Sequence, residues 1–239
     1  MKFLKVKFPV NVRNTEASYE TQYGINKGPT HYNASWDMAK LEVCSQKFVD
    51  LSEYGYAVSI LNNGKDGFAT VGNAMRLSLL RSSKAPDDTA EMGRHTIRWA
   101  IMPHSGQLGA RTVRAAFDFN NLLKLIRAMS EKRSILNDYP ISLQGDDSLV
   151  LDTIKRSEED EDISLVEPAA RKGRSVILRI YDSLGGRTRG IIAVNWRISK
   201  VYRKNILEDN IEEVSFQKGK FSVELWPFEV STYRISLEG

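Results

Sequence analysis

The sequence is poor in cysteine, in long apolar runs and in charge of one sign. Its single cysteine, Cys44, among 239 residues excludes an internal disulfide framework and a cysteine-rich zinc module. No stretch approaches the roughly 18 apolar residues that span a bilayer, and residues 1–10 alternate charged with apolar side chains instead of forming a signal-peptide core. The 34 basic and 30 acidic residues leave a net charge of only +4, with no basic tract for a phosphate backbone. These absences favour a reduced, intracellular globular protein that binds neither membrane nor nucleic acid.

Complete catalytic and metal-binding motifs are missing as well. His95 and His104 bracket a strand-like run, and nine extended residues place them roughly 30 Å apart, too far to share a metal ion. No Gly-x-Ser-x-Gly nucleophile motif occurs, and the glycine-containing segments 64–67 and 185–186 lie between strand-like runs, where they are expected to form turns. The adjacent carboxylates at 87–88 and at 146–147 point in opposite directions on an extended chain, so neither pair alone makes an acid–base couple.

Short β-type runs separated by turn residues dominate what is present. Residues 1–10 have the period of two that is typical of a strand. Three hairpins are predicted, each around a turn rich in glycine or asparagine. They join 54–61 to 68–80, 176–180 to 192–198, and 214–217 to 221–226. This pattern, with little helical periodicity, predicts an antiparallel all-β architecture of packed sheets.

One short helix and one domain boundary interrupt this pattern. Leu122, Ile126 and Met129 follow a helical spacing, with Asn120 or Asn121 available as the N-cap. The segment 157–174 combines an acidic run with a proline and a basic run, which is typical of a polar linker or loop. The chain is therefore predicted to comprise a β-sandwich portion at 1–156, this linker, and a C-terminal β domain at 175–239.

A polar segment at 14–37 carries several aromatic side chains. Tyr19, Tyr23, Tyr32 and Trp36 fall in this Asn- and Thr-rich stretch, which is predicted to be a long loop. Exposed rings can stack on sugars, but rings can also pack beneath a loop, and both interpretations remain open at this point.

Several strings of the sequence resemble the C-terminal half of class II α-mannosidases, glycoside hydrolase family 38, and most of all its cytosolic and fungal vacuolar branch. The strings lie at 13–24, 29–33, 35–37, 42–43, 47–48, 50–56, 76–81, 84–87, 92–95, 103–104, 149–152, 154–156, 178–181, 185–186, 205–208 and 227–230. They cover nearly the whole chain and are together far more specific than one short motif.

This resemblance implies a fold and a division of labour. The family's C-terminal region is a galactose mutarotase-like antiparallel β-supersandwich, here truncated at its N-terminal side, followed by a small C-terminal β domain. The zinc (or cobalt) ion, its ligands and the nucleophilic carboxylate belong to an N-terminal catalytic domain, so this chain is expected to hold no metal and to be inactive alone. The intact enzyme would hydrolyse terminal α-mannose from oligosaccharides with retention of configuration.

The resemblance also implies residues near the substrate and partners for the chain. Arg81 matches an arginine that reaches toward the sugar, and Lys84, Asp87 and His95 share its loop region. A guanidinium suits this role because its fixed fork donates paired hydrogen bonds. The implied partners are the N-terminal catalytic domain of the same polypeptide, mannose-containing oligosaccharides and further copies in a homo-oligomer, and the implied location is the cytoplasm or the vacuole.

A second hypothesis assigns the chain to another class of protein. It would then be an autonomous carbohydrate-binding or interaction module without hydrolase activity, whose aromatic loop at 19–36 holds glycans. An edge strand at residues 1–10 would in that case be expected to be capped or blunted against further pairing.

Overall fold

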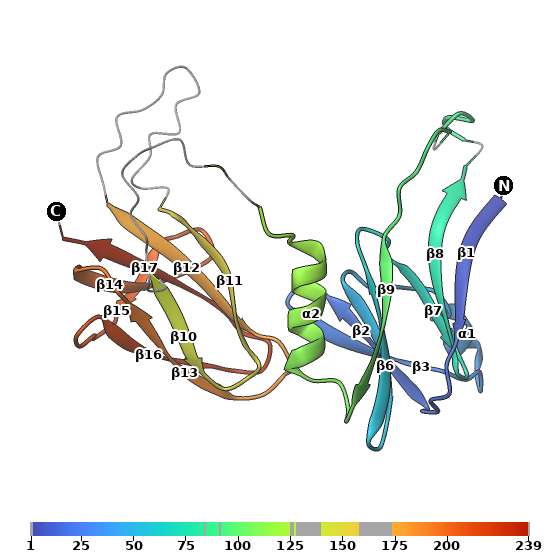
Figure 1. Cartoon of the computed structure of the whole chain (residues 1–239), viewed down its shortest axis with the longest axis horizontal. Helices are drawn as coiled ribbons and strands as arrows, with labels where there is room; N and C mark the ends of the chain where they lie inside the picture. The colour runs from blue at the N-terminus through green and yellow to red at the C-terminus, as the bar shows by residue number, and fades with distance from the viewer. Residues whose placement is uncertain are drawn as a thin grey trace. The chain divides into compact units, whose positions relative to one another are not determined.

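The chain forms two compact units, Met1–Leu125 and Ile126–Gly239. The computed structural model describes residues 2–83, 85–90, 92–124, 127, 140–157 and 174–238. Figure 1 shows the ribbon of both units, and each is described here by itself. Among these described residues, no helix is both long and apolar enough to cross a lipid bilayer.

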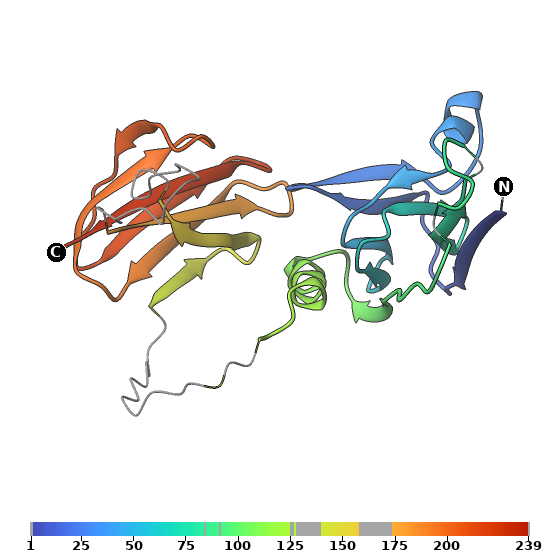
Figure 2. The ribbon, with the colours of Figure 1, turned by 90° about the horizontal axis from the view of Figure 1, so that it is seen from above.

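The first unit contains two antiparallel sheets. One has the strand order β1-β8-β7-β4 and the other β3-β2-β5-β6-β9. The first sheet comprises β1 (Lys2–Pro9), β4 (Val43–Cys44), β7 (Gly67–Val71) and β8 (Ala74–Ser82). The second comprises β2 (Glu16–Thr21), β3 (Gly24–Pro29), β5 (Phe48–Glu53), β6 (Tyr56–Asn62) and β9 (Trp99–Ser105). Figure 2 shows β2 and β3 as a hairpin seen from above.

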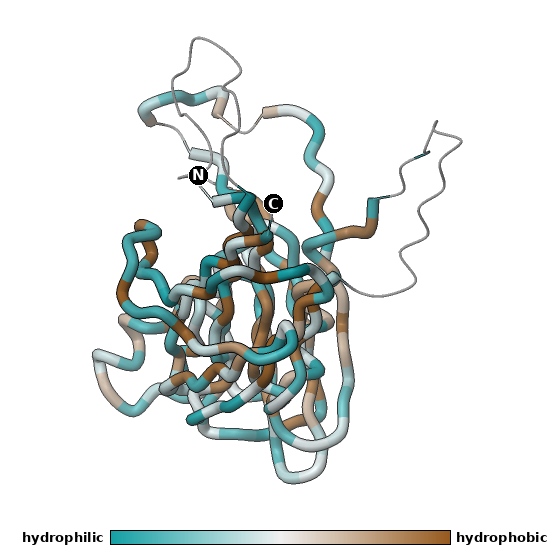
Figure 3. Tube along the Cα trace, turned by 90° about the vertical axis from the view of Figure 1, so that its left-hand side faces the viewer, coloured by the Kyte–Doolittle hydropathy of each residue, from teal (hydrophilic) through white to brown (hydrophobic). Residues whose placement is uncertain are grey.

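Apolar side chains from both sheets form one core in the first unit. Phe68 and Leu77 of the four-stranded sheet and Val49 and Ile60 of the five-stranded sheet are fully buried in it. This packing follows from strand alternation, which sends every second side chain toward the opposite sheet. Figure 3 shows apolar and polar residues interspersed along the chain.

Two helices accompany these sheets. The helix α1 (Ser35–Ala39) is short and buries none of its residues. The longer α2 (Ala110–Asn120) packs on β6 and β5 through a face that includes Val113 and Ala116. Its apolar positions recur at helical spacing, so the local pattern accounts for this helix.

The second unit is a β-sandwich of a three-stranded and a five-stranded sheet. The first has the order β10-β13-β16 and the second β11-β12-β17-β14-β15. The strands are β10 (Ile141–Gly145), β11 (Leu149–Arg156), β12 (Ser175–Asp182), β13 (Thr188–Val194), β14 (Ile198–Lys204), β15 (Asn210–Glu213), β16 (Lys220–Leu225) and β17 (Val230–Leu237). Its core joins Leu178, Ile180 and Ile235 from the larger sheet to Ile192 and Phe221 from the smaller one.

The all-β prediction and the first strand are confirmed, but the predicted strand partners are wrong. The strands β6 and β7 flank the predicted first turn, yet they lie in different sheets, and so do β12 and β13 around the second. At the third turn only one bridge forms, between Gln217 and Lys220. The turn residues are placed correctly, but the turns carry the chain from one sheet to the other instead of closing hairpins.

The helix and the domain boundary also differ from the predictions. The helix α2 ends at Asn120, and Asn121 caps its C-terminus instead of starting a new helix. Positions 126 and 129 of the predicted helix lie outside the described residues, as does nearly all of the predicted linker at 157–174. The strands β10 and β11, which were predicted to belong to the first domain, pair with β13 and β12 of the second unit.

Candidate functional site

Arg81 lies near the C-terminal end of β8, opposite Phe3 of β1. Its side chain is exposed, and the guanidinium carbon lies 5.7 Å from the centroid of the Phe3 ring. This distance is within the range of a cation–π contact. The neighbouring strand therefore provides a platform that orients the Arg81 side chain while leaving it accessible to solvent.

A carboxylate, Glu42, adds opposite charge close to Arg81. It accepts hydrogen bonds from the Lys5 ammonium and the Ser78 hydroxyl. Partial burial by itself raises the pKa of Glu42, but these two hydrogen bonds and the charges of Lys5 and Arg81 outweigh it, so the pKa is lowered. Glu42 stays ionised and attracts the Arg81 guanidinium, a contact between segments that are far apart along the chain.

The other predicted site residues lie on the connection between β8 and β9. Lys84 is outside the described residues. The Asp87 carboxylate accepts hydrogen bonds from the Thr89 amide at 2.9 Å and from its hydroxyl at 2.7 Å, which lower the pKa of Asp87. His95 is exposed. Arg81 thus lies on β8, whereas Asp87 and His95 lie on the connection that follows, where the Asp87 carboxylate shapes a local turn.

A buried polar network lies at the other end of β9, beneath α2. His104 Nε2 lies 2.8 Å from Asp50 Oδ2 and 3.1 Å from the Ser59 hydroxyl, which itself donates to Asp50 at 2.6 Å. The hydroxyl of Ser52 donates to the other Asp50 oxygen. Asp50 is only 1% exposed and Ser59 is fully buried.

This network contains the residue types of a catalytic triad but lacks its geometry. In a triad the carboxylate and the nucleophile contact different ring nitrogens of the histidine, whereas here both contact Nε2 of His104. The Ser59 hydroxyl is fully buried, so a substrate cannot reach it. The role of the cluster is therefore structural, since its hydrogen bonds join β5, β6, β9 and α2. His104 is therefore a satisfied core histidine.

The second unit has two further buried carboxylates in structural roles. Asp182 Oδ2 accepts three backbone amides, from Gly185, Gly186 and Phe228, at 2.7 to 3.0 Å. Lys155 forms an ion pair with Glu208 at 2.6 Å. These contacts involve four of the strings that carry the family resemblance, at 154–156, 185–186, 205–208 and 227–230. Residues in these strings therefore help to hold the loops in place.

The aromatic residues of segment 14–37 do not form one platform. Tyr19 belongs to β2 and is 3% exposed in the core, where burial raises its pKa. Tyr32 and Trp36 are 46% and 67% exposed. The predicted long loop is therefore partly a hairpin, and only its second half presents rings to solvent.

No group of three or more His, Cys, Asp or Glu side chains within the described ranges is arranged to hold a metal ion. The residues that the structure describes therefore do not fit a catalytic zinc site, which needs three protein ligands. No chemical step through a metal can be derived from them.

Comparisons with known proteins bear on both units. Residues 1–89 match the model described as "Glycosyl hydrolases family 38 C-terminal domain", and residues 148–233 match "Glycosyl hydrolases family 38 C-terminal beta sandwich domain". The chain is 44% identical to "Alpha-mannosidase" of Saccharomyces cerevisiae over 98% of its length and 33% identical to "Alpha-mannosidase 2C1" of Homo sapiens over 99%. It spans 22% of the length of each of these two relatives.

Solved structures show the same fold. The crystal structure of an alpha-mannosidase from Enterococcus faecalis V583 superposes on 97% of this chain with a TM-score of 0.76 and 16% sequence identity, and the chain covers 25% of that protein. A second solved structure, of a protein in glycosyl hydrolase family 38 from Enterococcus faecalis, gives a TM-score of 0.74 with 15% identity and also covers 97% of this chain.

Proposed function

Because this chain belongs to glycosyl hydrolase family 38, whose two C-terminal domains it carries, we propose that it is the non-catalytic C-terminal part of an α-mannosidase. The observation that carries this proposal is 44% identity with the yeast alpha-mannosidase across 98% of the chain. The intact enzyme hydrolyses terminal α-mannose from oligosaccharides with retention, in the cytoplasm or the vacuole. Zinc or cobalt is bound by its catalytic domain, outside this chain.

The local chemistry supports a non-catalytic role for the chain. Retaining glycosidases need two carboxyl groups about 5–5.5 Å apart on either side of the scissile bond. The Asp87 carboxylate is committed to a turn with Thr89, and Asp50 is buried in the network beneath α2. Neither side chain is placed to act as a nucleophile or as an acid on a sugar.

The chain buttresses the catalytic domain and lends the β8–β9 connection to the sugar cleft. Arg81 is the principal contact in this proposal, and Lys84, Asp87 and His95, which follow it along the chain, are the further contacts. Support comes from the exposed Arg81 guanidinium, which Phe3 and Glu42 orient by a ring contact and by charge. The partners are the catalytic domain of the same polypeptide, mannose-containing oligosaccharides and identical subunits.

Hydrolysis of an aryl α-mannoside tests this proposal. The chain is assayed alone, with added zinc or cobalt, and mixed with the separately produced remainder of the enzyme. Activity only in the mixture supports the proposal, and activity of the chain alone refutes it. In the mixture, Arg81→Ala is expected to lower kcat/KM about tenfold or more, whereas Arg111→Ala, which removes an exposed arginine from α2, should leave it unchanged.

A second candidate is a carbohydrate-binding or interaction module without hydrolase activity. The exposed rings of Tyr32 and Trp36 favour it, since they are available for stacking. Isothermal titration with mannose or a manno-oligosaccharide distinguishes the two candidates. This module would bind sugar through Trp36 and would add nothing to hydrolysis in the mixture.

A further inference from the structure

The outer face of the three-stranded sheet in the second unit has features of a binding surface. Strand alternation buries Ile192 and Phe221 in the core and turns Ile191 and Ser222 outward. The register places Gln144, Ile191 and Ser222 side by side across β10, β13 and β16. An apolar side chain thus lies between an amide and a hydroxyl on an exposed sheet.

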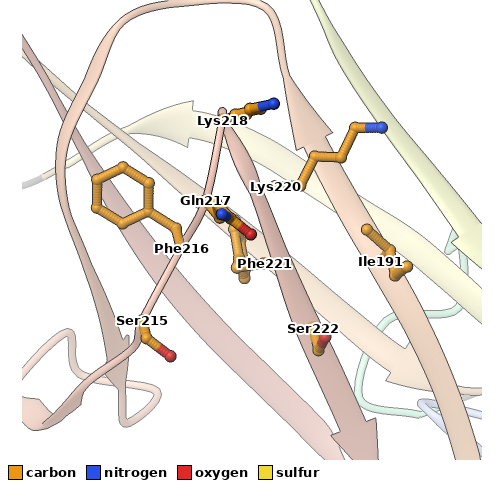
Figure 4. Close-up of a pocket in the computed structure, with 8 residues that line it drawn as sticks. All are labelled: Ile191, Ser215, Phe216, Gln217, Lys218, Lys220, Phe221 and Ser222. Carbon is orange, nitrogen blue, oxygen red and sulfur yellow. The ribbon is translucent and has the colours of Figure 1, made fainter.

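Two hollows adjoin on this face. One, of about 490 Å³, extends from Ile191 and Ser222 to Phe216, Lys218 and Lys220. Figure 4 shows Phe216 and Ile191 on either side of β16, with the two lysines toward the turn. The other, of about 400 Å³, shares Ile191 and Ser222 and extends the hollow surface toward Gln144. Together they form a shallow strip along β13 and β16.

One exposed aromatic ring, Phe216, lies at one end of this strip, and another, Trp226, lies just past the other end. Trp226 follows β16 on the outward side and is 61% exposed, and the Arg187 guanidinium lies 4.2 Å from its ring centroid. Phe216 is 36% exposed at the opposite end. The bridge between Gln217 and Lys220 places the Phe216 end of the strip beside Lys220, and Trp226 is six positions further on, which is roughly 20 Å of extended strand. A ligand touching both rings is therefore an extended chain several units long.

The middle of the strip favours a neutral ligand, whereas Lys218 and Lys220 lie toward the turn, at its Phe216 end. Arg189 and Glu224 neutralise one another through an ion pair of 3.2 Å, so the middle of the strip has no excess charge for an anion. Gln144 and Ser222 can each donate and accept hydrogen bonds. Ile191 is 48% exposed but is flanked by polar side chains, which suits the apolar face of a sugar better than an apolar peptide.

We propose that this face binds a neutral oligosaccharide laid along β16, with Trp226 and Phe216 as its end platforms. Sugar rings present apolar C–H faces to aromatic rings and hydroxyls to Gln144 and Ser222. The identification of the ligand as a chain of α-mannose rests on the proposed function, whereas the site itself rests on this surface. It would hold a substrate chain by residues remote from the hydrolysed bond.

Isothermal titration of the full 239-residue chain with α-linked mannotriose tests the site, and cellotriose serves as the comparison sugar. Mannotriose is expected to bind with a Kd of about 1 mM. Trp226→Ala and Ile191→Asp should each weaken binding at least tenfold, and Tyr54→Ala, which removes an exposed ring from the first unit, is the matched control that should not. All three side chains are exposed, so thermal unfolding of the variants should match that of the wild type.

The outcomes separate the site from the proposed function. No heat with either sugar up to about 20 mM, or binding that both strip variants leave unchanged, overturns the site. Cellotriose binding that Trp226→Ala abolishes supports an oligosaccharide site but overturns its assignment to α-mannose. If the site binds sugar while the enzyme mixture hydrolyses no aryl α-mannoside, the proposed function fails and the site stands.

Discussion

Replacing Asp50, whose side chain is buried, should strongly destabilise the first unit. The Asp50 carboxylate accepts hydrogen bonds from Ser52, Ser59 and His104, and α2 packs on the strands that carry two of them. Asp50→Ala leaves these donors without their acceptor, at about 1–3 kcal/mol for each one that stays buried and unpaired. Because the Ser59 hydroxyl can still bond His104 at 3.1 Å, the expected loss is about 3 kcal/mol.

Urea unfolding measures this loss if each unit has its own reporter. Trp36 and Trp99 lie in the first unit, and Trp196 and Trp226 in the second. Replacing the latter two by Phe restricts the fluorescence signal to the first unit, whose midpoint should then fall by about 1–3 M urea. The opposite pair of replacements reports on the second unit, whose midpoint should stay constant.

Two further variants decide whether the network causes the effect. Asp50→Asn keeps one acceptor oxygen and should cost less, about 1–2 kcal/mol. In a double-mutant cycle, Asp50→Ala and His104→Ala should show a coupling of about 0.5–3 kcal/mol. Strict additivity, or equal losses for Asp50→Asn and Asp50→Ala, would refute the reasoning.

Three other predictions concern packing and pH. Gly190→Ala should cost the second unit about 1–3 kcal/mol in urea unfolding, since the added Cβ would lie 2.6 Å from Leu149 Cδ1. An unchanged midpoint would show that β13 shifts to accommodate the methyl group at no measurable cost in stability. Burial raises the pKa of Tyr19, so its contribution to stability is present below pH 10 and is lost as the pH rises above that value; Tyr19→Phe should flatten this alkaline loss. The pKa of Glu42 is lowered, so its contribution to stability is present above about pH 4.3 and disappears as the pH falls through the folded-state pKa. Because the Glu42 side chain of the Lys5–Glu42 ion pair is over a third exposed, Glu42→Gln should cost at most about 1 kcal/mol of stability at pH 7 and nothing at pH 2.

Local patterns were enough to predict strands and turns, but not which strands pair. Glycine and asparagine at 62–67 correctly mark a reversal, since only backbone conformation is at stake there. Whether the next strand joins the same sheet depends on packing of both sheets around a shared core, which no five-residue window contains. Val113 and Ala116 have helical spacing, but the sequence analysis did not predict α2. The residues after Asn121 are more apolar, and the helix was therefore predicted there instead.

The candidate site shows the same limit. Family resemblance predicted Arg81, but its neighbours Phe3 and Glu42 come from β1 and from the segment before β4, far from it along the chain. His95 is exposed and His104 is buried, and nothing local in the sequence indicated that His104 meets Asp50 across β6. Contacts between distant segments depend on sheet order, and sheet order was the part of the fold that the sequence did not yield.

The position of β17 has a consequence for synthesis on the ribosome. This strand lies between β12 and β14 in the middle of the five-stranded sheet, so β11 and β12 cannot join β14 and β15 until it arrives. Within the described ranges, the sheets of the first unit contain no strand after β9, so they can form while the second unit is still being translated. Nascent chains that stop before Val230 would expose the unpaired edges of β12 and β14, which makes them ready substrates for chaperones and for aggregation.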